Sequence, residues 1–407
     1  MDYIKRNIEE LINEVSQSYA ALILTGPRQV GKTTTLQMLA GQERKYVTLD
    51  DLEDRRMARS DPELFLSLNP SPLLIDEVQY APELFSRIKI EIDRGAKPGS
   101  YWLTGSQTFH LIELAQESLA GRAAVLRMQS LSQNEIYGIA PNTPFNVDFD
   151  ALRARIESGT KTDTKGQYER IWNGSLPGHV SGKYPHREVF YGSYLSAYIE
   201  RDVADMLSRV DKLLFTDFIR AAACRTAQIL VVHDIAQDVG VTDDTAKRWL
   251  RILEKSGVIF YLRPYSSNLL KRTIKTPKLY FFDTGLVSYL TRYTTPEILM
   301  NGAINGAILE NYAILEILKT YSNSGIECIA HYYRDKEGKE IDLIIENGGM
   351  LHPIEIKKTA SPPAELTSNF KILDKNSLPR GTGAIICTKQ EISAIDRSTV
   401  IVPVWTI

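Results

Sequence analysis

Apolar and polar positions in the first 130 residues follow two alternating patterns. Short apolar runs of strand length are separated by stretches in which apolar residues recur every three or four positions. The runs are Ala20–Leu24, Tyr46–Leu49, Leu73–Ile75, Tyr101–Leu103 and Ala124–Met128. Strands that alternate with amphipathic helices are typical of a parallel sheet covered on both faces. The pattern therefore predicts an α/β domain over residues 1–140.

The next stretch predicts a helical linker or lid over residues 141–214. Ser132 followed by Glu135 predicts a capping box that opens a helix. Residues 141–164 are polar and predicted to be irregular. From residue 168 the spacing of apolar positions is mainly helical. We interpret its tyrosines as core or interface residues rather than a ligand site.

A phosphate-binding pattern follows the first apolar run. Residues 26–33 match G-x-x-x-x-G-K-[ST], and a helical run begins directly after them. The glycines would let backbone amides surround phosphates, with the helix N-terminus directed at them. Lys32 would reach the β- and γ-phosphates, and Thr33 would bind magnesium. The predicted ligands are ATP and Mg²⁺, and the candidate nucleotide-binding residues are Gly26, Pro27, Arg28, Gln29, Val30, Gly31, Lys32, Thr33 and Thr34.

Two carboxylates end the apolar run at residues 72–77. Behind a phosphate loop, Asp76 would hold magnesium, and Glu77 would orient and deprotonate the attacking water. The alternative is an acid pair in a solvated turn. Thr104 and Ser106 end the next strand and would contact the γ-phosphate or the water; the alternative is a polar cap on a buried strand.

An arginine that stabilises the transferred phosphoryl group is also expected. Arg122 is a candidate arginine finger that acts on its own nucleotide or on that of a neighbouring chain. Arg28, inside the phosphate loop, is the alternative phosphate contact.

These motifs resemble the bacterial and archaeal AAA-type ATPases that carry a C-terminal domain of unknown function numbered 4143. The matching segments are residues 24–33, 74–79, 103–106, 119–122 and 198–203. The resemblance covers essentially the whole chain, and it implies ATP binding and an AAA-like fold. The chain differs at Asn173–Pro177, where such proteins usually have a Gly-Gly-Tyr-Pro-like turn.

A winged helix is predicted over residues 215–297. His233–Thr242 predicts a short helix, a glycine turn and an N-cap, and a second helix follows over Asp243–Lys255. Ile259–Leu262 and Leu279–Phe282 predict the strands of the wing.

Basic residues of this region are candidates for DNA contacts. They lie on the second helix (Lys247, Arg248, Arg251) and in the predicted wing loop (Lys271, Arg272, Lys275, Lys278). Asp243 and Asp244 at the helix start would repel phosphates, and winged helices also serve as packing modules. Both interpretations stay open.

Residues 298–407 predict a small α/β domain in which a helix precedes alternating strands. On a strand Glu355 and Lys357 share one face, with Asp342 on the preceding strand. This arrangement resembles the D...E-x-K core of restriction-endonuclease-like proteins. Asp342 and Glu355 would hold a divalent metal, Lys357 would position water, and Glu310 would be an additional acid. The alternative is a solvated strand face without activity.

Composition limits the class of protein. The 407 residues carry a formal net charge of −2, so the chain has no global positive field that indicates nucleic acid. Three widely spaced cysteines match no metal-ligand pattern and favour a reducing compartment. No run of 18 apolar residues occurs, and the first residues are polar. We expect a soluble cytoplasmic protein without a membrane partner.

Together the motifs predict an ATPase that couples nucleotide hydrolysis to a task on double-stranded DNA or on a DNA-bound protein. The alternative is a nucleotide-controlled protein-interaction module with an inactive nuclease-like scaffold. A third hypothesis is a homo-oligomer whose assembly depends on nucleotide, as Arg122 acting between chains would require.

Overall fold

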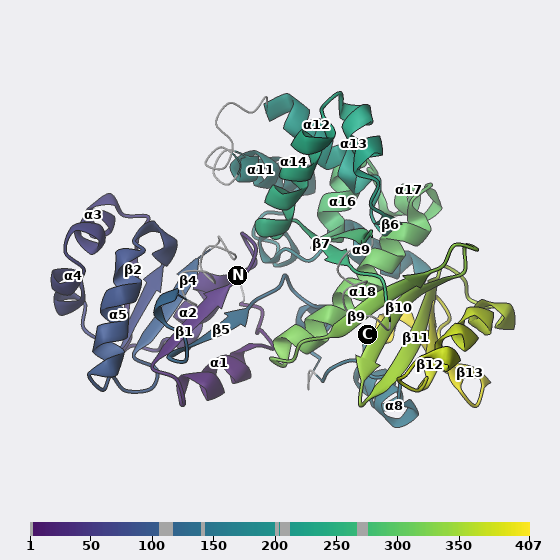
Figure 1. The fold of residues 1–407 in the computed structure, drawn as a ribbon, viewed down its shortest axis with the longest axis horizontal. Helices are drawn as coiled ribbons and strands as arrows, with labels where there is room; N and C mark the ends of the chain where they lie inside the picture. Colours follow the sequence, from purple (N-terminus) through teal and green to yellow (C-terminus); the bar gives the residue numbers. More distant parts are fainter. Residues whose placement is uncertain (1–2, 106–116, 140–142, 200–202, 204–211, 267–275) are drawn as a thin grey trace.

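A five-stranded parallel sheet in the order β2-β3-β4-β1-β5 forms the centre of the N-terminal region (Figure 1). The computed structural model describes residues 3–105, 117–139, 143–199, 203, 212–266 and 276–407. The strands are β1 (Ala21–Thr25), β2 (Lys45–Thr48), β3 (Leu73–Asp76), β4 (Tyr101–Gly105) and β5 (Ala123–Arg127). Each lies within two residues of its predicted position. Because all neighbours are parallel, the carboxyl ends of β1 and β3 meet at one edge of the sheet.

Helices cover both faces of this sheet. They are α1 (Glu9–Ser16), α2 (Lys32–Leu39), α3 (Leu52–Ser60), α4 (Pro62–Leu68) and α5 (Glu83–Asp93), with a 3₁₀ turn at Val78–Tyr80. Along β1, Ala21 and Ile23 pack into one hydrophobic cluster that contains residues of α3, α4 and α5. Leu22 and Leu24 point to the opposite face and belong to a second cluster that continues into the rest of the chain.

The following residues are mostly helical. The helices are α7 (Gln133–Tyr137), α8 (Phe149–Ser158), α9 (Thr164–Asn173), α10 (Pro177–Val180), α11 (Arg187–Tyr198) and α12 (Lys212–Ala223). The predicted capping box is present, since Ser132 and Glu135 exchange side-chain to backbone hydrogen bonds. The prediction of an irregular segment at 141–164 is wrong at α8. There Asp148 caps the helix and Leu152 is buried.

The middle of the chain holds two helices beside a small antiparallel sheet. The elements are β6 (Gln228–Ile229), α13 (Val232–Val239), α14 (Asp243–Lys255), β7 (Ile259–Leu262) and β8 (Lys278–Phe281), with the strand order β6-β8-β7. Gly240 ends α13 with φ +75°, a conformation that favours glycine. Both helices and both hairpin strands lie where the pattern predicted them. The placement of Lys278 in a wing loop is wrong, because this residue lies in β8 and is 2% exposed.

The last part of the chain is a mixed sheet with helices. Its helices are α16 (Thr284–Leu290), α17 (Pro296–Asn301) and α18 (Asn305–Asn323), and 3₁₀ segments span Ala364–Lys375 and Val404–Thr406. The strands are β9 (Ile329–Arg334), β10 (Glu340–Asn347), β11 (Met350–Lys357), β12 (Gly383–Cys387), β13 (Ser393–Asp396) and β14 (Thr399–Pro403). Their order is β13-β14-β12-β11-β10-β9, with β10 antiparallel to β11 and β11 parallel to β12. A small α/β arrangement was predicted here.

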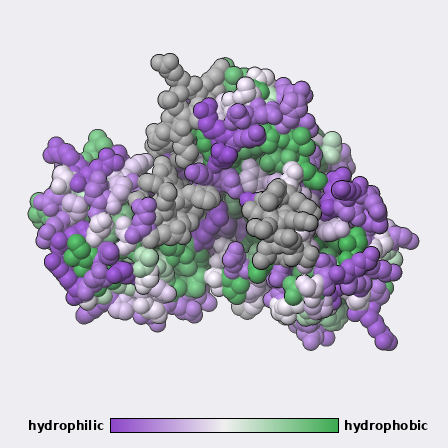
Figure 2. Space-filling model, in the orientation of Figure 1, coloured by the Kyte–Doolittle hydropathy of each residue, from purple (hydrophilic) through white to green (hydrophobic). Residues whose placement is uncertain are grey.

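The parts of the chain pack against one another rather than forming separate modules in series. Helix α18 lies between the middle region and the last sheet, and α8 packs against the 3₁₀ segment near the C-terminus (Figure 1). The face drawn in Figure 2 is mainly hydrophilic, with hydrophobic residues in scattered patches. Within the described residues, no helix is both long and apolar enough to cross a membrane. The predicted boundaries at 140, 214 and 297 stay predictions.

Candidate functional site

Glycines shape the loop between β1 and α2. Gly26 has φ +151°, and a Cβ placed on it would lie 2.2 Å from the carbonyl oxygen of Met128. Gly31 has φ +95° and caps α2 in a left-handed conformation. A side chain at either position would therefore strain the loop or strike the neighbouring backbone. The two glycines of the phosphate-binding pattern are required by this local geometry.

Lys32 and Thr33 lie at the first turn of α2. The buried Lys32 Nζ donates hydrogen bonds to the carbonyl oxygens of Gly26 (2.9 Å) and Pro27 (2.8 Å), so the ammonium lies within the curve of the loop. Thr33 Oγ1 donates to Oδ1 of Asp76 at the end of β3, at 2.9 Å. The parallel sheet brings these two motifs together although 43 positions separate the residues. A hydroxyl and a carboxylate provide the oxygen ligands that Mg²⁺ prefers.

Two further side chains contact the acidic pair, and the sequence did not indicate either. Tyr46 on β2 donates its hydroxyl to Oδ2 of Asp76 at 3.2 Å, and Gln79 donates its amide to the carboxylate of Glu77. Burial raises the pKa of Asp76, while the hydrogen bond from Thr33 lowers it. Glu77 has φ +53°, an unusual conformation for a residue with a side chain. Tyr46 lies within an apolar run that predicted only a strand. Gln79 lies in a segment that resembles the ATPase family, but its residue type alone predicts no role at the site.

A cleft of about 980 Å³ lies beside the phosphate loop. Tyr3 and Ile4 line one part of it, and residues of α10, α11 and their connection form a second wall. In that second wall the ring of Tyr184 stacks on Phe190, with centroids 6.0 Å apart. An aromatic and apolar cleft next to a phosphate loop is suited to enclose a nucleotide base.

The predicted nuclease-like residues also come together. The antiparallel register that pairs Leu343 with Ile354 brings Asp342 and Glu355 to neighbouring positions. Lys357 Nζ lies 2.8 Å from Asp342 Oδ2 and 2.9 Å from Glu355 Oε2.

Glu310 on α18 pairs with Lys278, which was predicted to lie in the wing loop and to contact DNA. Lys278 Nζ is 3.0 Å from Glu310 Oε1 and 2.5 Å from Glu340 Oε1. Burial and then the charge of Asp342 raise the pKa of Glu310 to about 7 and that of Glu355 to about 8. Across the described part of the chain, no three His, Cys, Asp or Glu side chains are arranged to hold a metal ion.

Comparison with known families agrees with this geometry. An AAA domain matches residues 18–137, and a domain of unknown function, DUF4143, matches residues 305–407. The chain therefore combines an AAA-type P-loop domain with a DUF4143 domain. A further domain of unknown function, DUF8612, matches residues 164–297 between them.

Two mycobacterial proteins and two archaeal structures are similar to this chain. The uncharacterized proteins Mb2031c of Mycobacterium bovis and Rv2008c of Mycobacterium tuberculosis are each 27% identical over 367 residues, which are 87% of this chain and 74% of each relative. The Walker-type ATPase paby2304 of Pyrococcus abyssi is 14% identical, with a TM-score of 0.46 over 71% of this chain and 96% of that one. A signal transduction ATPase with numerous domains, PH0952 of Pyrococcus horikoshii, is 11% identical, with a TM-score of 0.23 over 79% and 47% of the two chains.

Arg6 attaches the N-terminal segment to the back of the P-loop of the AAA domain. Its buried guanidinium donates to the carbonyl oxygens of Val30 (2.8 Å) and Gln129 (2.8 Å) and to Oε1 of Glu135 (3.0 Å). Glu135 is the acid of the capping box. The same carboxylate therefore caps the start of α7 and holds the phosphate loop through Arg6, and the sequence predicted only the first role.

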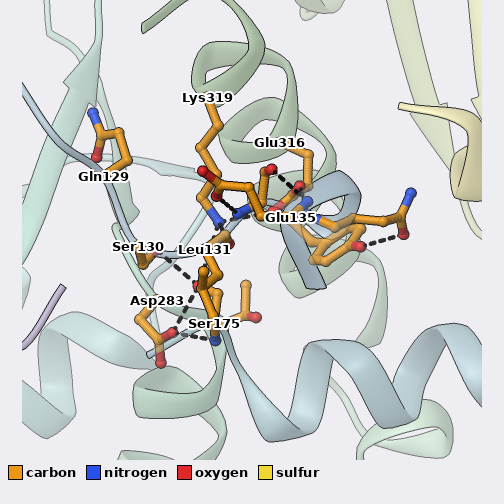
Figure 3. Close-up of polar contacts among 12 residues, drawn as sticks. Gln129, Ser130, Leu131, Glu135, Ser175, Asp283, Glu316 and Lys319 are labelled. Carbon is orange, nitrogen blue, oxygen red and sulfur yellow. Dashed lines mark hydrogen bonds and ion pairs between the residues drawn. The ribbon is translucent and has the colours of Figure 1, made fainter. Parts of the chain in front are cut away.

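A buried polar junction connects the AAA domain with α18 of the DUF4143 domain (Figure 3). Glu316 accepts the backbone N–H of Gln133 at 2.7 Å. Lys319 Nζ donates to the carbonyl oxygen of Leu131 (2.7 Å), to Glu316 (2.8 Å) and to Ser175 Oγ (3.3 Å). Ser175 lies in the segment Asn173–Pro177 between α9 and α10. Its N–H and hydroxyl both contact Asp283, at 2.7 and 3.0 Å.

Arg122 lies far from the P-loop of its own chain. The register of β1 and β5 pairs Ala21 with Ala123 and Thr25 with Arg127, so Arg122 is at the edge opposite the phosphate loop. Its guanidinium is paired with Asp93 at 2.6 Å. Five residues of strand separate the two edges, or about 16 Å. This geometry places Arg122 away from its own chain's nucleotide site, and a role at a neighbouring chain's nucleotide stays a prediction.

The other candidates have different positions. Thr104 is buried in β4, and its hydroxyl has no hydrogen-bond partner among the described residues. Arg28 is partly exposed in the phosphate loop. Lys247 and Arg248 lie on the exposed side of α14, where Lys247 is 3.6 Å from Asp244. Arg251 is also exposed on α14, and Ser106, Lys271, Arg272 and Lys275 lie outside the described residues.

Proposed function

We propose that the AAA domain binds ATP with Mg²⁺ and hydrolyses it. The observation that carries the proposal is the 2.9 Å contact between Thr33 and Asp76 directly beside the buried Lys32. These are the residue types that hold magnesium and phosphate in P-loop NTPases. Bound magnesium would neutralise charge that develops on the phosphates.

The chain's own residues would divide the remaining work. Lys32 would exchange its carbonyl partners for phosphate oxygens, and the loop amides would bind the other oxygens. Glu77 would accept a proton from the water that attacks the γ-phosphorus, which releases ADP. Thr104, whose buried hydroxyl has no hydrogen-bond partner among the described residues, is the candidate to contact the γ-phosphate. The base would lie in the cleft against Tyr184.

The biological task that we infer is DNA-related. Helix α12, β6, α13, α14, β7 and β8 follow one another in the order of a winged helix, and the strand order β6-β8-β7 fits that fold. Lys247 and Arg248 on the exposed side of α14 would contact phosphates of double-stranded DNA. A DNA-bound protein is the other partner that this surface could serve.

A second candidate function is a nucleotide-controlled interaction module with an inactive nuclease-like scaffold. The observation that favours it is the pairing of Asp342 and Glu355 with Lys357, and of Glu310 with Lys278. Carboxylates that bind ammonium groups are not free to bind a metal ion. The two functions differ in whether DNA changes the rate of ATP hydrolysis.

The experiment is Mg²⁺-dependent ATP hydrolysis by the wild type and by Glu77→Gln, each with and without double-stranded DNA. We expect DNA to stimulate the wild type and Glu77→Gln to bind ATP without turnover. Lys32→Ala should lose nucleotide binding, and retained binding would remove Lys32 from its role. Hydrolysis that does not respond to DNA would favour the interaction module.

Arg122 gives a separate test of homo-oligomerisation. If it acts on a neighbouring chain's nucleotide, ATP should shift the sedimentation coefficient toward a larger assembly. Arg122→Ala should then lower turnover without weakening ATP binding. An unchanged coefficient with ATP would contradict this role.

A further inference from the structure

The 3₁₀ turn Val78–Tyr80, directly after the acidic pair, contains a buried amide side chain. Gln79 is 5% exposed, and Val78 and Ala81 in the same segment are fully buried apolar residues. The Nε2 group of Gln79 donates a hydrogen bond to Oε2 of Glu77, and its Oε1 atom has no hydrogen-bond partner among the described residues. A reversed amide would place its oxygen against the carboxylate, so the contact with Glu77 fixes the orientation of the amide.

A glutamine at this position costs free energy that an apolar side chain would avoid. A buried polar atom that lacks a hydrogen bond carries a desolvation penalty, and the Oε1 atom of Gln79 is in this state with respect to the described residues. Methionine or leucine would pack beside Val78 without that penalty. Packing therefore does not explain the glutamine. The hydrogen bond to Glu77 is the interaction that an apolar residue could not supply.

The backbone that carries Glu77 is fixed in an unusual conformation. Glu77 has φ +53°, and such a conformation persists where the surrounding structure imposes it. The carbonyl oxygen of Glu77 accepts the N–H of Tyr80 at 3.0 Å. Tyr80 is in turn held by α3, since Arg55 lies over its ring at 4.1 Å and Arg59 donates to its carbonyl oxygen. The turn thus provides a rigid base from which Gln79 holds the carboxylate.

We propose that Gln79 is a positioning residue for ATP hydrolysis, which holds the Glu77 carboxylate in the orientation that accepts a proton from the attacking water. The inference rests on the proposed function of the P-loop site. A carboxylate has two oxygen atoms, so one can bind the amide while the other accepts the proton. A general base contributes roughly 10²–10⁴-fold to a rate, and a displacement of about 1 Å can cost about 10²-fold. Loss of Gln79 should therefore lower the rate of hydrolysis and leave the affinity for ATP unchanged.

The test is single-turnover ATP hydrolysis with the full-length protein in excess over ATP, for the wild type, Gln79→Met, Glu77→Gln and the double variant. Methionine has nearly the length of glutamine but cannot donate a hydrogen bond. We expect Gln79→Met to lower the rate about ten- to hundredfold, with ATP affinity unchanged by calorimetry. In the Glu77→Gln background the same change should have no further effect, because Gln79 acts through that carboxylate. A residue that merely stabilises the turn would slow both backgrounds alike.

Asn69→Leu is the matched control. Asn69 is a 6% exposed amide of the same domain, and it donates to the carbonyl oxygen of Phe65 in α4. It lies four positions before β3, at the end of the strand opposite Asp76, so its loss should leave the rate unchanged. Gln79→Glu provides a second variant if Gln79→Met does not fold, because a carboxylate cannot donate to Glu77 and repels its charge.

The outcomes separate this proposal from the proposed function. If the wild type hydrolyses ATP and Glu77→Gln does not, an undiminished or faster rate in Gln79→Met would overturn the positioning role and leave the proposed hydrolysis intact. An equal loss in the wild-type and Glu77→Gln backgrounds would also overturn the positioning role alone, as would an equal loss in Asn69→Leu. A wild type without ATP hydrolysis, or normal turnover by Glu77→Gln, would overturn both.

Discussion

Replacement of Arg6 by methionine tests whether the buried ion pair behind the P-loop stabilises the AAA domain. Arg6 is 2% exposed and Glu135 is fully buried, so the pair is shielded from water. Loss of one partner of such a pair costs about 3–5 kcal/mol, because the other charge stays buried. Glu135 keeps two backbone donors, the N–H groups of Asn7 (2.8 Å) and Ser132 (2.6 Å). We therefore expect a loss near the lower limit, about 3 kcal/mol.

The assay is guanidinium unfolding of the wild type, Arg6→Met, Glu135→Gln and the double variant. The two single changes should be strongly non-additive, because each removes the same interaction. Arg153→Met is the control, since the pair of Arg153 with Glu157 is 69% and 68% exposed and should contribute less than about 1 kcal/mol. Arg6→Met should also weaken ATP binding, because Val30 loses its donor. Additive losses, or a loss no larger than that of the control, would refute the reasoning.

Three further outcomes follow from the geometry. Gly26→Ala should weaken ATP binding and destabilise the protein by about 1–3 kcal/mol, because its Cβ would lie 2.2 Å from the Met128 carbonyl oxygen; calorimetry measures both effects. Thr33→Ala should reduce the affinity for ATP with magnesium much more than the affinity for ATP alone, as titration with and without EDTA would show. Replacement of both Lys247 and Arg248 by glutamine should remove about two phosphate contacts and so reduce the slope of log affinity for DNA against log salt concentration. An unchanged slope in a salt titration would remove α14 from the interface.

The elements of this fold were predictable where the signal is local. The five strands of the first sheet, the capping box at Ser132 and the helices around Gly240 depend on residues within a few positions of one another. The P-loop pattern also predicted that Thr33 and Asp76 would meet, because parallel strands place their carboxyl ends at one edge. The strand, cap and helix signals each lie within one segment, and the contact of Thr33 with Asp76 follows from two local motifs together with the rule for parallel strands.

Long-range pairing explains what the sequence did not reveal. Lys278 was assigned to a loop because its neighbours are basic, but the acids that bind it are 32 and 62 positions away. Arg122 matched a family motif, yet only the strand register shows which edge of the sheet it occupies. Arg6 likewise contacts Glu135 across 129 positions, and no local pattern marks such a pair.

The polar junction at the centre of the molecule determines how the parts should be tested. Lys319 on α18 is fully buried and neutralised by Glu316, and both residues bind the backbone of the segment 131–133. That segment begins two residues after Gln129, whose carbonyl oxygen accepts a hydrogen bond from Arg6, as does that of Val30 in the P-loop. Removal of the DUF4143 domain would therefore leave backbone groups of the AAA domain without partners. A loss of ATP hydrolysis in a truncated chain would reflect these broken contacts, and single substitutions in the full chain separate the two domains better.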